Sequence, residues 1–159
     1  MKIGIIGAGM IGGTLARRLT ALGHEVVIAN SRGPETLREV AAETGARAVT
    51  AAEAAHGGEV VIVTIPERAV PDLPRDLFAG VSEDVVVVDT GNYYPARDGR
   101  LDAIEHGQVE SAWVAEHLGR PVVKVFNNIG YESLLENGGF LHIFGGLNLV
   151  FTLPPWPVM

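Results

Sequence analysis

Apolar residues along this 159-residue chain gather in short runs, separated by longer stretches whose apolar positions recur every three or four residues. The short runs predict buried strands, and they lie at 2–6, 25–29, 46–49, 59–65, 84–89 and 122–126. The longer stretches predict helices at 11–22, 35–44, 51–56 and 111–118, with a shorter, proline-broken helix from 66 to about 78. This alternation predicts an α/β fold with a doubly wound, mostly parallel sheet and helices on both faces.

The turn between the first predicted strand and the first predicted helix is rich in glycine. It contains Gly7, Ala8, Gly9, Met10, Ile11 and Gly12, which form the pattern G-x-G-x-x-G. Between a strand and a helix this pattern is typical of the Rossmann-like dinucleotide-binding fold. Gly7 permits the tight turn, Gly9 lets a pyrophosphate approach the backbone, and Gly12 allows the helix to pack closely on the strand. The pattern therefore predicts nucleotide binding; the alternative is a glycine-rich turn without a ligand.

The end of the second predicted strand carries a hydroxyl and a guanidinium instead of a carboxylate. Asn30, Ser31 and Arg32 follow this strand, at the point where the sheet geometry places the adenosine ribose. NAD-binding domains place an acidic residue here to bind the ribose 2′-OH, whereas a hydroxyl and an arginine suit a 2′-phosphate. The sequence therefore predicts NADP(H) in preference to NAD(H). In the alternative interpretation Ser31 caps the helix that begins at Pro34, and Arg32 is a solvated surface charge.

Polar and aromatic residues follow three more predicted strands. These segments are Thr64, Ile65 and Pro66, then Asp89–Pro95, and finally Lys124–Ile129. Because ligands bind outside the carboxyl ends of parallel strands, we expect all three segments to border the cofactor. Asn127 is placed to hydrogen-bond a carboxamide, and Phe126 or Tyr94 to form a wall of the nicotinamide pocket. The alternative is that these residues form turns and pack in the interior.

The composition excludes several classes of function. The net charge of −7 and the pI near 5.1, with no cluster of basic residues, argue against nucleic acid or a membrane surface as partner. The chain has no cysteine, so it has neither disulfides nor thiolate ligands, and its five histidines show no metal-binding spacing. It begins directly with a predicted strand and no leader. We therefore expect a cytoplasmic protein that binds small-molecule cofactors and no metal.

The last 23 residues differ from the rest of the chain. No Asp, Glu, Lys or Arg occurs in 137–159, which is rich in apolar residues but too interrupted to form a membrane span. Two interpretations remain open: a core strand that completes the sheet, or a non-native tail left by truncation or a frame shift. We accordingly expect an NADP-binding domain at 1–136 and a separate apolar tail at 137–159.

Five segments together resemble the NADPH-dependent reductases of the deazaflavin coenzyme F-420. They are Gly7–Gly12, Ala29–Pro34, Thr64–Pro66, Asp89–Pro95 and Phe126–Ile129, and the resemblance covers about residues 1–136. It implies a Rossmann domain that binds NADP(H), with Gly7–Gly12 at the pyrophosphate and Ser31 and Arg32 at the 2′-phosphate. It further implies hydride transfer between nicotinamide and F-420, and a possible homodimer. Because hydride passes directly between two rings, no catalytic side chain is assigned. Members of the family continue for several dozen residues where this chain has its apolar tail.

Two other functions remain open from the sequence. The first is a reductase of a small imine or hydroxy acid built on the same domain. Such an enzyme needs a proton donor, for which Lys124 is the candidate after the last strands. The second is a non-catalytic NADP-binding module or truncated remnant.

Overall fold

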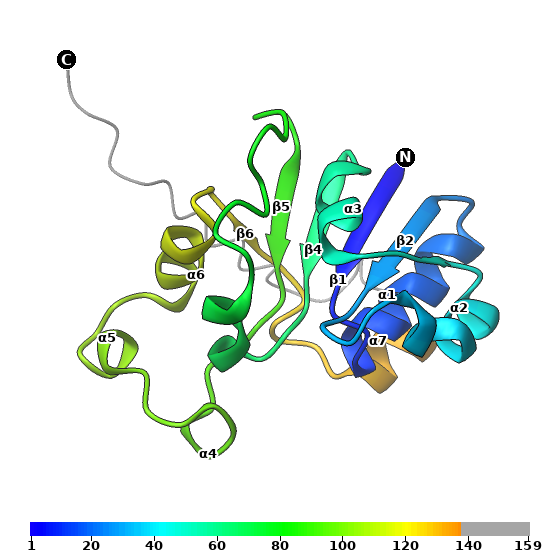
Figure 1. The fold of residues 1–159 in the computed structure, drawn as a ribbon. Coiled ribbons are helices and arrows are strands. Elements are labelled where there is room, and N and C mark those ends of the chain that lie inside the picture. The colour runs from blue at the N-terminus through cyan, green and yellow to red at the C-terminus, as the bar shows by residue number, and fades with distance from the viewer. Residues whose placement is uncertain (138–159) are drawn as a thin grey trace.

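The computed structural model describes residues 1–137 and contains one six-stranded sheet. The strands are β1 (Lys2–Ile6), β2 (Glu25–Ala29), β3 (Arg47–Ala48), β4 (Val60–Val63), β5 (Val86–Asp89) and β6 (Val123–Lys124). Their order is β3-β2-β1-β4-β5-β6 and every neighbouring pair is parallel (Figure 1). This is the strand order of the Rossmann fold, and it confirms the predicted doubly wound α/β sheet.

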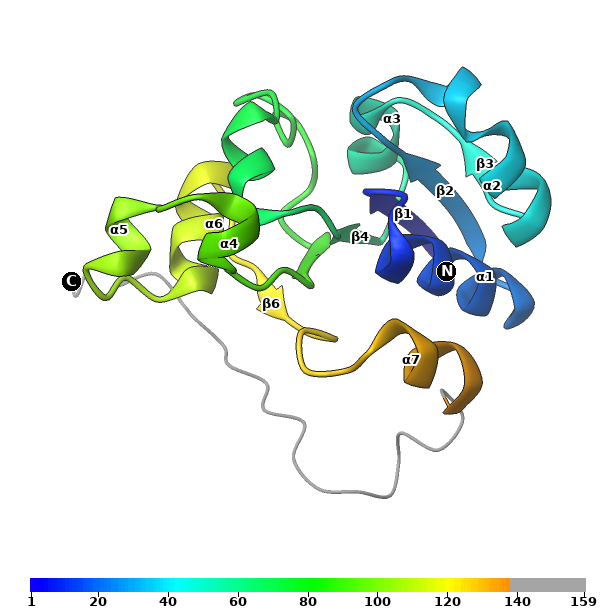
Figure 2. The same cartoon turned by 90° about the horizontal axis from the view of Figure 1, so that it is seen from below.

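Helices cover both faces of the sheet. They are α1 (Met10–Ala21), α2 (Arg38–Thr44), α3 (Ala51–His56), α4 (Pro95–Asp98), α5 (Asp102–Glu105), α6 (Glu110–Leu118) and α7 (Tyr131–Asn137), with 3₁₀ turns η1 (Pro34–Leu37) and η2 (Glu67–Asp72). Figure 2 shows α1 and α7 on one side of the sheet, and α3 and α6 on the other. From β1 the chain proceeds to one edge of the sheet through β2 and β3, and from β4 it proceeds to the other edge through β5 and β6. The direction thus reverses between β1 and β4, and a crevice opens at the carboxyl ends of these two strands.

The core consists of two apolar clusters, one on each face of the sheet. Successive residues of a strand point to opposite faces, so Val27 joins the cluster under α3 and α6, and Ile28 joins the cluster under α1 and α7. In β4 the same alternation separates Val61 from Ile62. Burial on both faces explains why these strands are continuous runs of valine and isoleucine.

The structure corrects several predicted boundaries. The helix predicted at 35–44 is a 3₁₀ turn from Pro34 followed by a short α-helix, and the helix predicted after Pro66 is the single 3₁₀ element η2. The strand predicted at 122–126 ends at Lys124, because Phe126 adopts a left-handed backbone with φ of 65°. The short helices α4, α5 and α7 carried too little apolar periodicity to be predicted. All of the predicted tail except its first residue lies outside the described residues.

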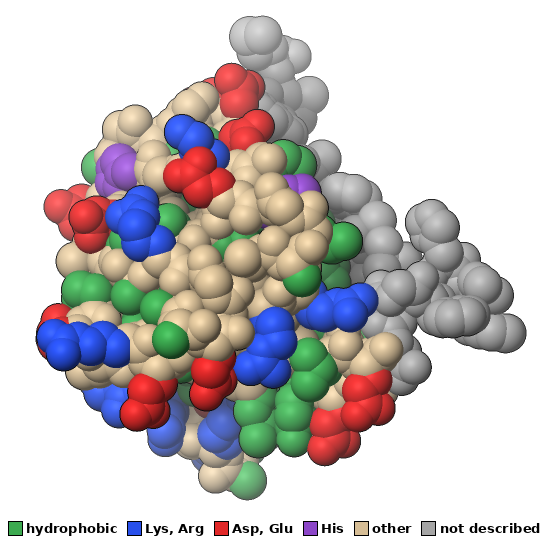
Figure 3. Space-filling view, turned by 90° about the vertical axis from the view of Figure 1, so that its right-hand side faces the viewer, with side chains coloured by type: hydrophobic (Ala, Val, Ile, Leu, Met, Phe, Trp, Pro, Cys, Tyr) green, Lys and Arg blue, Asp and Glu red, His purple; other side chains and the backbone are tan. Residues whose placement is uncertain are grey.

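Acidic and basic side chains are interspersed on the face of the molecule seen in Figure 3. Within residues 1–137 no helix is long and apolar enough to cross a membrane. The same residues contain no group of three or more side chains that is arranged to hold a metal ion.

Candidate functional site

Two cavities lie side by side at the carboxyl edge of the sheet. The smaller has a volume of about 420 Å³ and lies between the glycine loop, the end of β2 and η2. The larger has a volume of about 800 Å³ and lies between the start of α1 and the segments after β4, β5 and β6. Gly9 and the segment Thr64–Pro66 line both cavities, so the two form one cleft with the glycine loop at its middle.

The glycine loop is shaped by close backbone contacts on one side and open space on the other. Gly7 has φ of 117°, and its N–H donates to the Ala29 carbonyl at 2.9 Å. A methyl group on Gly12 would collide with the Gly7 carbonyl, which requires glycine where α1 meets the loop. A methyl group on Gly9 would meet nothing within 4 Å, so that backbone faces the cleft. No side chain caps α1, which leaves the N–H groups of its first turn available to an anion.

The turn after β2 is held by the side chain of Asn30. Its Oδ1 accepts the backbone N–H of Arg32 at 2.9 Å, and its Nδ2 donates to Thr36 Oγ1 at 2.9 Å. Thr36 Oγ1 in turn donates to the Gly33 carbonyl at 2.8 Å. The side chains of Ser31 and Arg32 make none of these bonds, and they are exposed at the rim of the smaller cavity.

No carboxylate stands at the tip of β2. Glu35 lies three residues after Arg32, in η1, and it is not among the residues that line the smaller cavity. The carboxylate that does line this cavity is that of Asp72, which comes from η2 and not from the end of β2. The end of the cleft beside β2 is thus bordered by Ser31 and Arg32.

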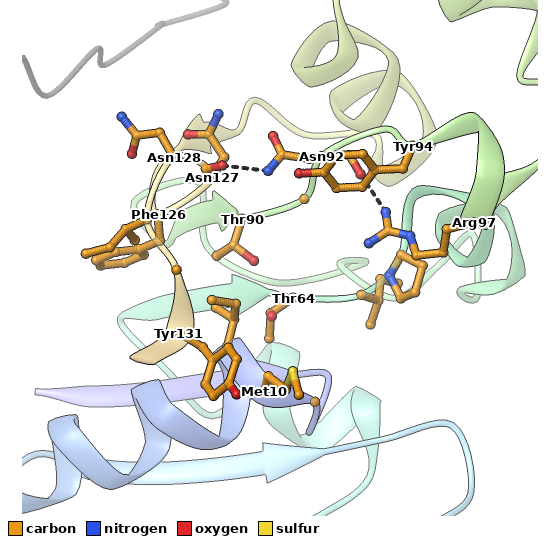
Figure 4. Close-up of a pocket in the computed structure, with 17 residues that line it drawn as sticks. Met10, Thr64, Thr90, Asn92, Tyr94, Arg97, Phe126, Asn127, Asn128 and Tyr131 are labelled. Atoms are coloured by element: carbon orange, nitrogen blue, oxygen red, sulfur yellow. Dashed lines mark hydrogen bonds between the residues drawn. The ribbon is translucent and has the colours of Figure 1, made fainter. Parts of the chain in front are cut away.

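Amide and aromatic side chains line the larger cavity (Figure 4). Asn92 Nδ2 donates to the Asn127 carbonyl at 2.5 Å, which joins the segments that follow β5 and β6. Tyr94 is half exposed, and the guanidinium of Arg97 lies 5.1 Å from the centre of its ring. Phe126 borders the opposite side of the same cavity. Its left-handed backbone is uncommon for an aromatic residue and occurs where the chain turns from β6 along the cavity.

Arg97 is the only cationic side chain among the described residues that line the larger cavity. Its Nη2 donates to Asp98 Oδ2 at 2.7 Å and to the Asn92 carbonyl at 2.5 Å. Burial raises the pKa of Asp98, but hydrogen bonds from Arg97 and from the Tyr94 N–H outweigh it, and the net effect lowers this pKa. Arg97 is therefore held in a fixed orientation beside Tyr94.

Behind the larger cavity lies a buried ion cluster centred on Lys124. Its Nζ is 2.8 Å from Asp89 Oδ2, 3.4 Å from Glu67 Oε1 and 3.5 Å from Glu110 Oε2. Lys124 and Asp89 are almost fully buried, and Glu67 is fully buried. Burial, followed by repulsion from Asp89, raises the pKa of Glu67 to about 7. Lys124 does not line the cavity, so its amine is not placed to protonate a substrate there.

The structure brings nearly all predicted site residues to this cleft. Gly7, Ala8, Asn30, Ser31 and Arg32 line the smaller cavity, Met10, Ile11 and Asn127 line the larger, and Gly9, Thr64, Ile65 and Pro66 line both. Gly12 lines neither and serves the packing of α1 on the loop.

Sequence reasoning missed Arg97, Asp72 and Tyr131, which also line the cleft. Arg97 and Tyr131 come from short helices, and Asp72 from a 3₁₀ turn, so none of them follows a strand directly. The one available signal was that Arg97 stands two residues after Tyr-Tyr-Pro, a segment already assigned to the rim.

Comparison with known proteins gives the family. The model of the family described as NADP oxidoreductase, coenzyme F420-dependent, matches residues 2–93. A hypothetical protein from Sinorhizobium meliloti is 35% identical, with a TM-score of 0.68, and the match covers 85% of this chain and 66% of that one. A candidate F420-dependent NADP reductase from an Arthrobacter species is 23% identical, with a TM-score of 0.68 and coverage of 87% and 67%.

An imine reductase from a Pseudomonas species shares the fold at 22% identity, with a TM-score of 0.56 and coverage of 83% and 43%. The chain thus spans about two thirds of the first two proteins and less than half of the third. The family match extends over more than half of this chain and includes β1 to β5, the glycine loop and the turn after β2. The chain belongs to the NADP oxidoreductase, coenzyme F420-dependent family.

Proposed function

We propose that this chain binds NADP(H) across the cleft and transfers a hydride between NADPH and the deazaflavin coenzyme F-420. The observation that carries the proposal is the pair of cavities joined at Gly9. In this arrangement the pyrophosphate lies on Gly9 at the start of α1, the adenosine half lies in the smaller cavity and the nicotinamide half in the larger. Ser31 and Arg32 bind the 2′-phosphate.

The size of the larger cavity supports a second ring beside the nicotinamide. Ligand sites commonly have volumes of about 300–1,000 Å³, and this cavity, at about 800 Å³, lies in the upper part of that range. Tyr94 and Phe126 offer flat surfaces on which rings can stack, and the amides of Asn92 and Asn127 offer hydrogen bonds. Direct hydride transfer requires that two rings are aligned and shielded from water, and it requires no acid or base from the protein.

The imine or hydroxy acid reductase receives less support. Its candidate proton donor, Lys124, is buried and paired with three carboxylates. The description of the matching family names coenzyme F420, which supports the deazaflavin as the second substrate over an imine or a hydroxy acid.

Calorimetric titration of the protein with NADPH and with NADH tests the cofactor assignment. We expect Arg32→Glu to weaken NADPH binding about tenfold to a hundredfold, since a charge-assisted hydrogen bond contributes about 1.5–3 kcal/mol, and to change NADH binding little. Equal losses for both nucleotides would contradict the role of Arg32.

Two glycine variants test where the pyrophosphate lies. Gly9→Ala adds a methyl group that meets open space in the protein, so we expect unchanged stability and weaker binding of both nucleotides. Gly13→Ala is the matched control, because its methyl group also meets nothing and Gly13 lines neither cavity. Addition of F-420 to the NADPH complex, followed by the loss of deazaflavin absorbance, then tests hydride transfer separately from binding.

A further inference from the structure

The buried ion cluster behind the larger cavity carries more negative than positive charge. It unites Glu67 of η2, Asp89 of β5, Lys124 of β6 and Glu110 of α6, with Lys124 as its one cation in direct contact. Glu110 retains about a third of its side-chain exposure, so solvent screens its charge. Glu67 and Asp89 are buried, and one lysine cannot neutralise both carboxylates.

Gly91 lies between this cluster and the cavity. Gly91 lines the cavity, and its N–H donates to Asp89 Oδ1 at 2.8 Å. A methyl group on Gly91 would lie 2.6 Å from Glu67 Oε1, so the carboxylate packs directly against this backbone. The other oxygen of Glu67, Oε2, is buried without a hydrogen-bond partner. Because a buried oxygen without a hydrogen-bond partner is costly when charged, the ionised form of Glu67 is disfavoured at this position.

Oxidised and reduced nicotinamides differ in charge, and the cluster is close enough to the larger cavity to interact electrostatically with a ring bound there. The ring of NADP⁺ is cationic and the ring of NADPH is neutral. A net negative charge behind the cavity wall, in a region of low dielectric constant, attracts the cationic ring of NADP⁺ and has little effect on the neutral ring of NADPH. We propose that Glu67 and Asp89 set the relative affinity for NADP⁺ and NADPH electrostatically, so that the ionised cluster favours NADP⁺ over NADPH. This inference rests on the NADP(H) site proposed above.

Protonation of Glu67 switches this preference near neutral pH. Burial raises the pKa of Glu67 to about 7, with repulsion from Asp89 and Glu110 acting in the same direction and attraction to Lys124 acting against it. The guanidinium of Arg97 in α4 is a further charge that interacts with Glu67. Below this pH the cluster is close to neutral, and above it the cluster carries the extra charge. Binding of NADP⁺ therefore releases a proton from Glu67, and binding of NADPH does not.

The test is the ratio of the dissociation constants of NADP⁺ and NADPH, measured by calorimetry from pH 5.5 to pH 9. The ratio is used because both nucleotides carry the same 2′-phosphate, which also titrates near pH 6. We expect the ratio to fall about tenfold as pH rises from about 6 to about 7 and to be level above that, which corresponds to a lowering of the Glu67 pKa by about one unit on NADP⁺ binding. Titrations in buffers of different ionisation enthalpy should show more protons released by NADP⁺ than by NADPH, because the contribution of the 2′-phosphate is common to both.

Glu67→Gln should hold the ratio at its low-pH value throughout. Glu83→Gln is the matched control, because it removes an exposed carboxylate at the opposite, amino end of β5 and should leave the wild-type pH dependence unchanged. A wild-type ratio that is constant with pH, or a Glu67→Gln profile that matches the wild type, overturns the inference and leaves the NADP(H) site intact. If neither nucleotide binds at any pH, the proposed function itself is wrong.

Discussion

The ionisation of Glu67 should make the stability of this protein fall with rising pH, and Glu67→Gln should remove that fall. The pKa of Glu67 is raised from 4.5 to about 7 by its burial and by Asp89. The folded protein therefore binds the proton more tightly than the unfolded chain, so the free energy of unfolding decreases between about pH 4.5 and pH 7 and is level above that. A window of about 2.5 pH units corresponds to about 3 kcal/mol, at about 1.4 kcal/mol for each unit.

Urea unfolding of the wild type and of Glu67→Gln between pH 5.5 and pH 8 measures this effect. The difference in unfolding free energy between the two proteins cancels the other titrating groups, and we expect the wild type to lose about 2 kcal/mol relative to the variant over this range. Glu83→Gln should show no such trend. A difference that is constant with pH would refute the reasoning. A difference that changes in favour of the wild type as pH rises would show that attraction to Lys124 exceeds the cost of burying the carboxylate.

Four substitutions test the packing of the site and its support. Gly12→Ala should lower the unfolding free energy by about 2 kcal/mol in urea because its methyl group meets the Gly7 carbonyl, whereas Gly13→Ala should raise it by up to about 1 kcal/mol. Thr50→Ala removes the side chain that caps α3 and should cost about 1 kcal/mol in the same assay, with NADPH affinity unchanged. Lys124→Met leaves the buried carboxylates without a cation and should cost about 3–5 kcal/mol at pH 8, and less at pH 5.5, where a proton replaces the lysine charge.

The sheet and the glycine loop could be predicted because their signals are local. Runs of valine and isoleucine mark strands that are buried on both faces, and Gly7 and Gly12 stand where backbone contacts exclude a side chain. The residues after each strand could be assigned to one rim because parallel strands end at the same edge of a sheet. These inferences need only a few neighbouring residues each.

The ion cluster and the approach of Arg97 and Tyr131 to the larger cavity could not be predicted, because they depend on long-range contacts. Lys124 was noticed as an isolated lysine and assigned to a possible proton donor. Its partners Asp89 and Glu67 are 35 and 57 positions away, and no local pattern links them. Arg97 reaches the cavity from α4, a helix of four residues that carries no periodic signal. The sequence alone therefore could not predict which charged side chains lie close together in the fold.

The two ends of the cleft carry side chains of opposite charge. Nicotinamide cofactors differ in two features, the 2′-phosphate and the charge of the nicotinamide ring. Arg32 lines the smaller cavity, where we propose that the 2′-phosphate binds, and Glu67 packs against Gly91 in the wall of the larger cavity, where we propose that the nicotinamide ring binds. Among the described residues these two side chains have no hydrogen-bond partner in common. Their effects on nucleotide affinity should therefore add in the double variant Arg32→Glu, Glu67→Gln. Its loss of preference for NADPH over NADH should equal that of Arg32→Glu alone. Its loss of pH dependence in the ratio of the NADP⁺ and NADPH dissociation constants should equal that of Glu67→Gln alone. Coupling of more than about 0.5 kcal/mol between them would show that the nucleotide does not span the cleft in the orientation proposed here.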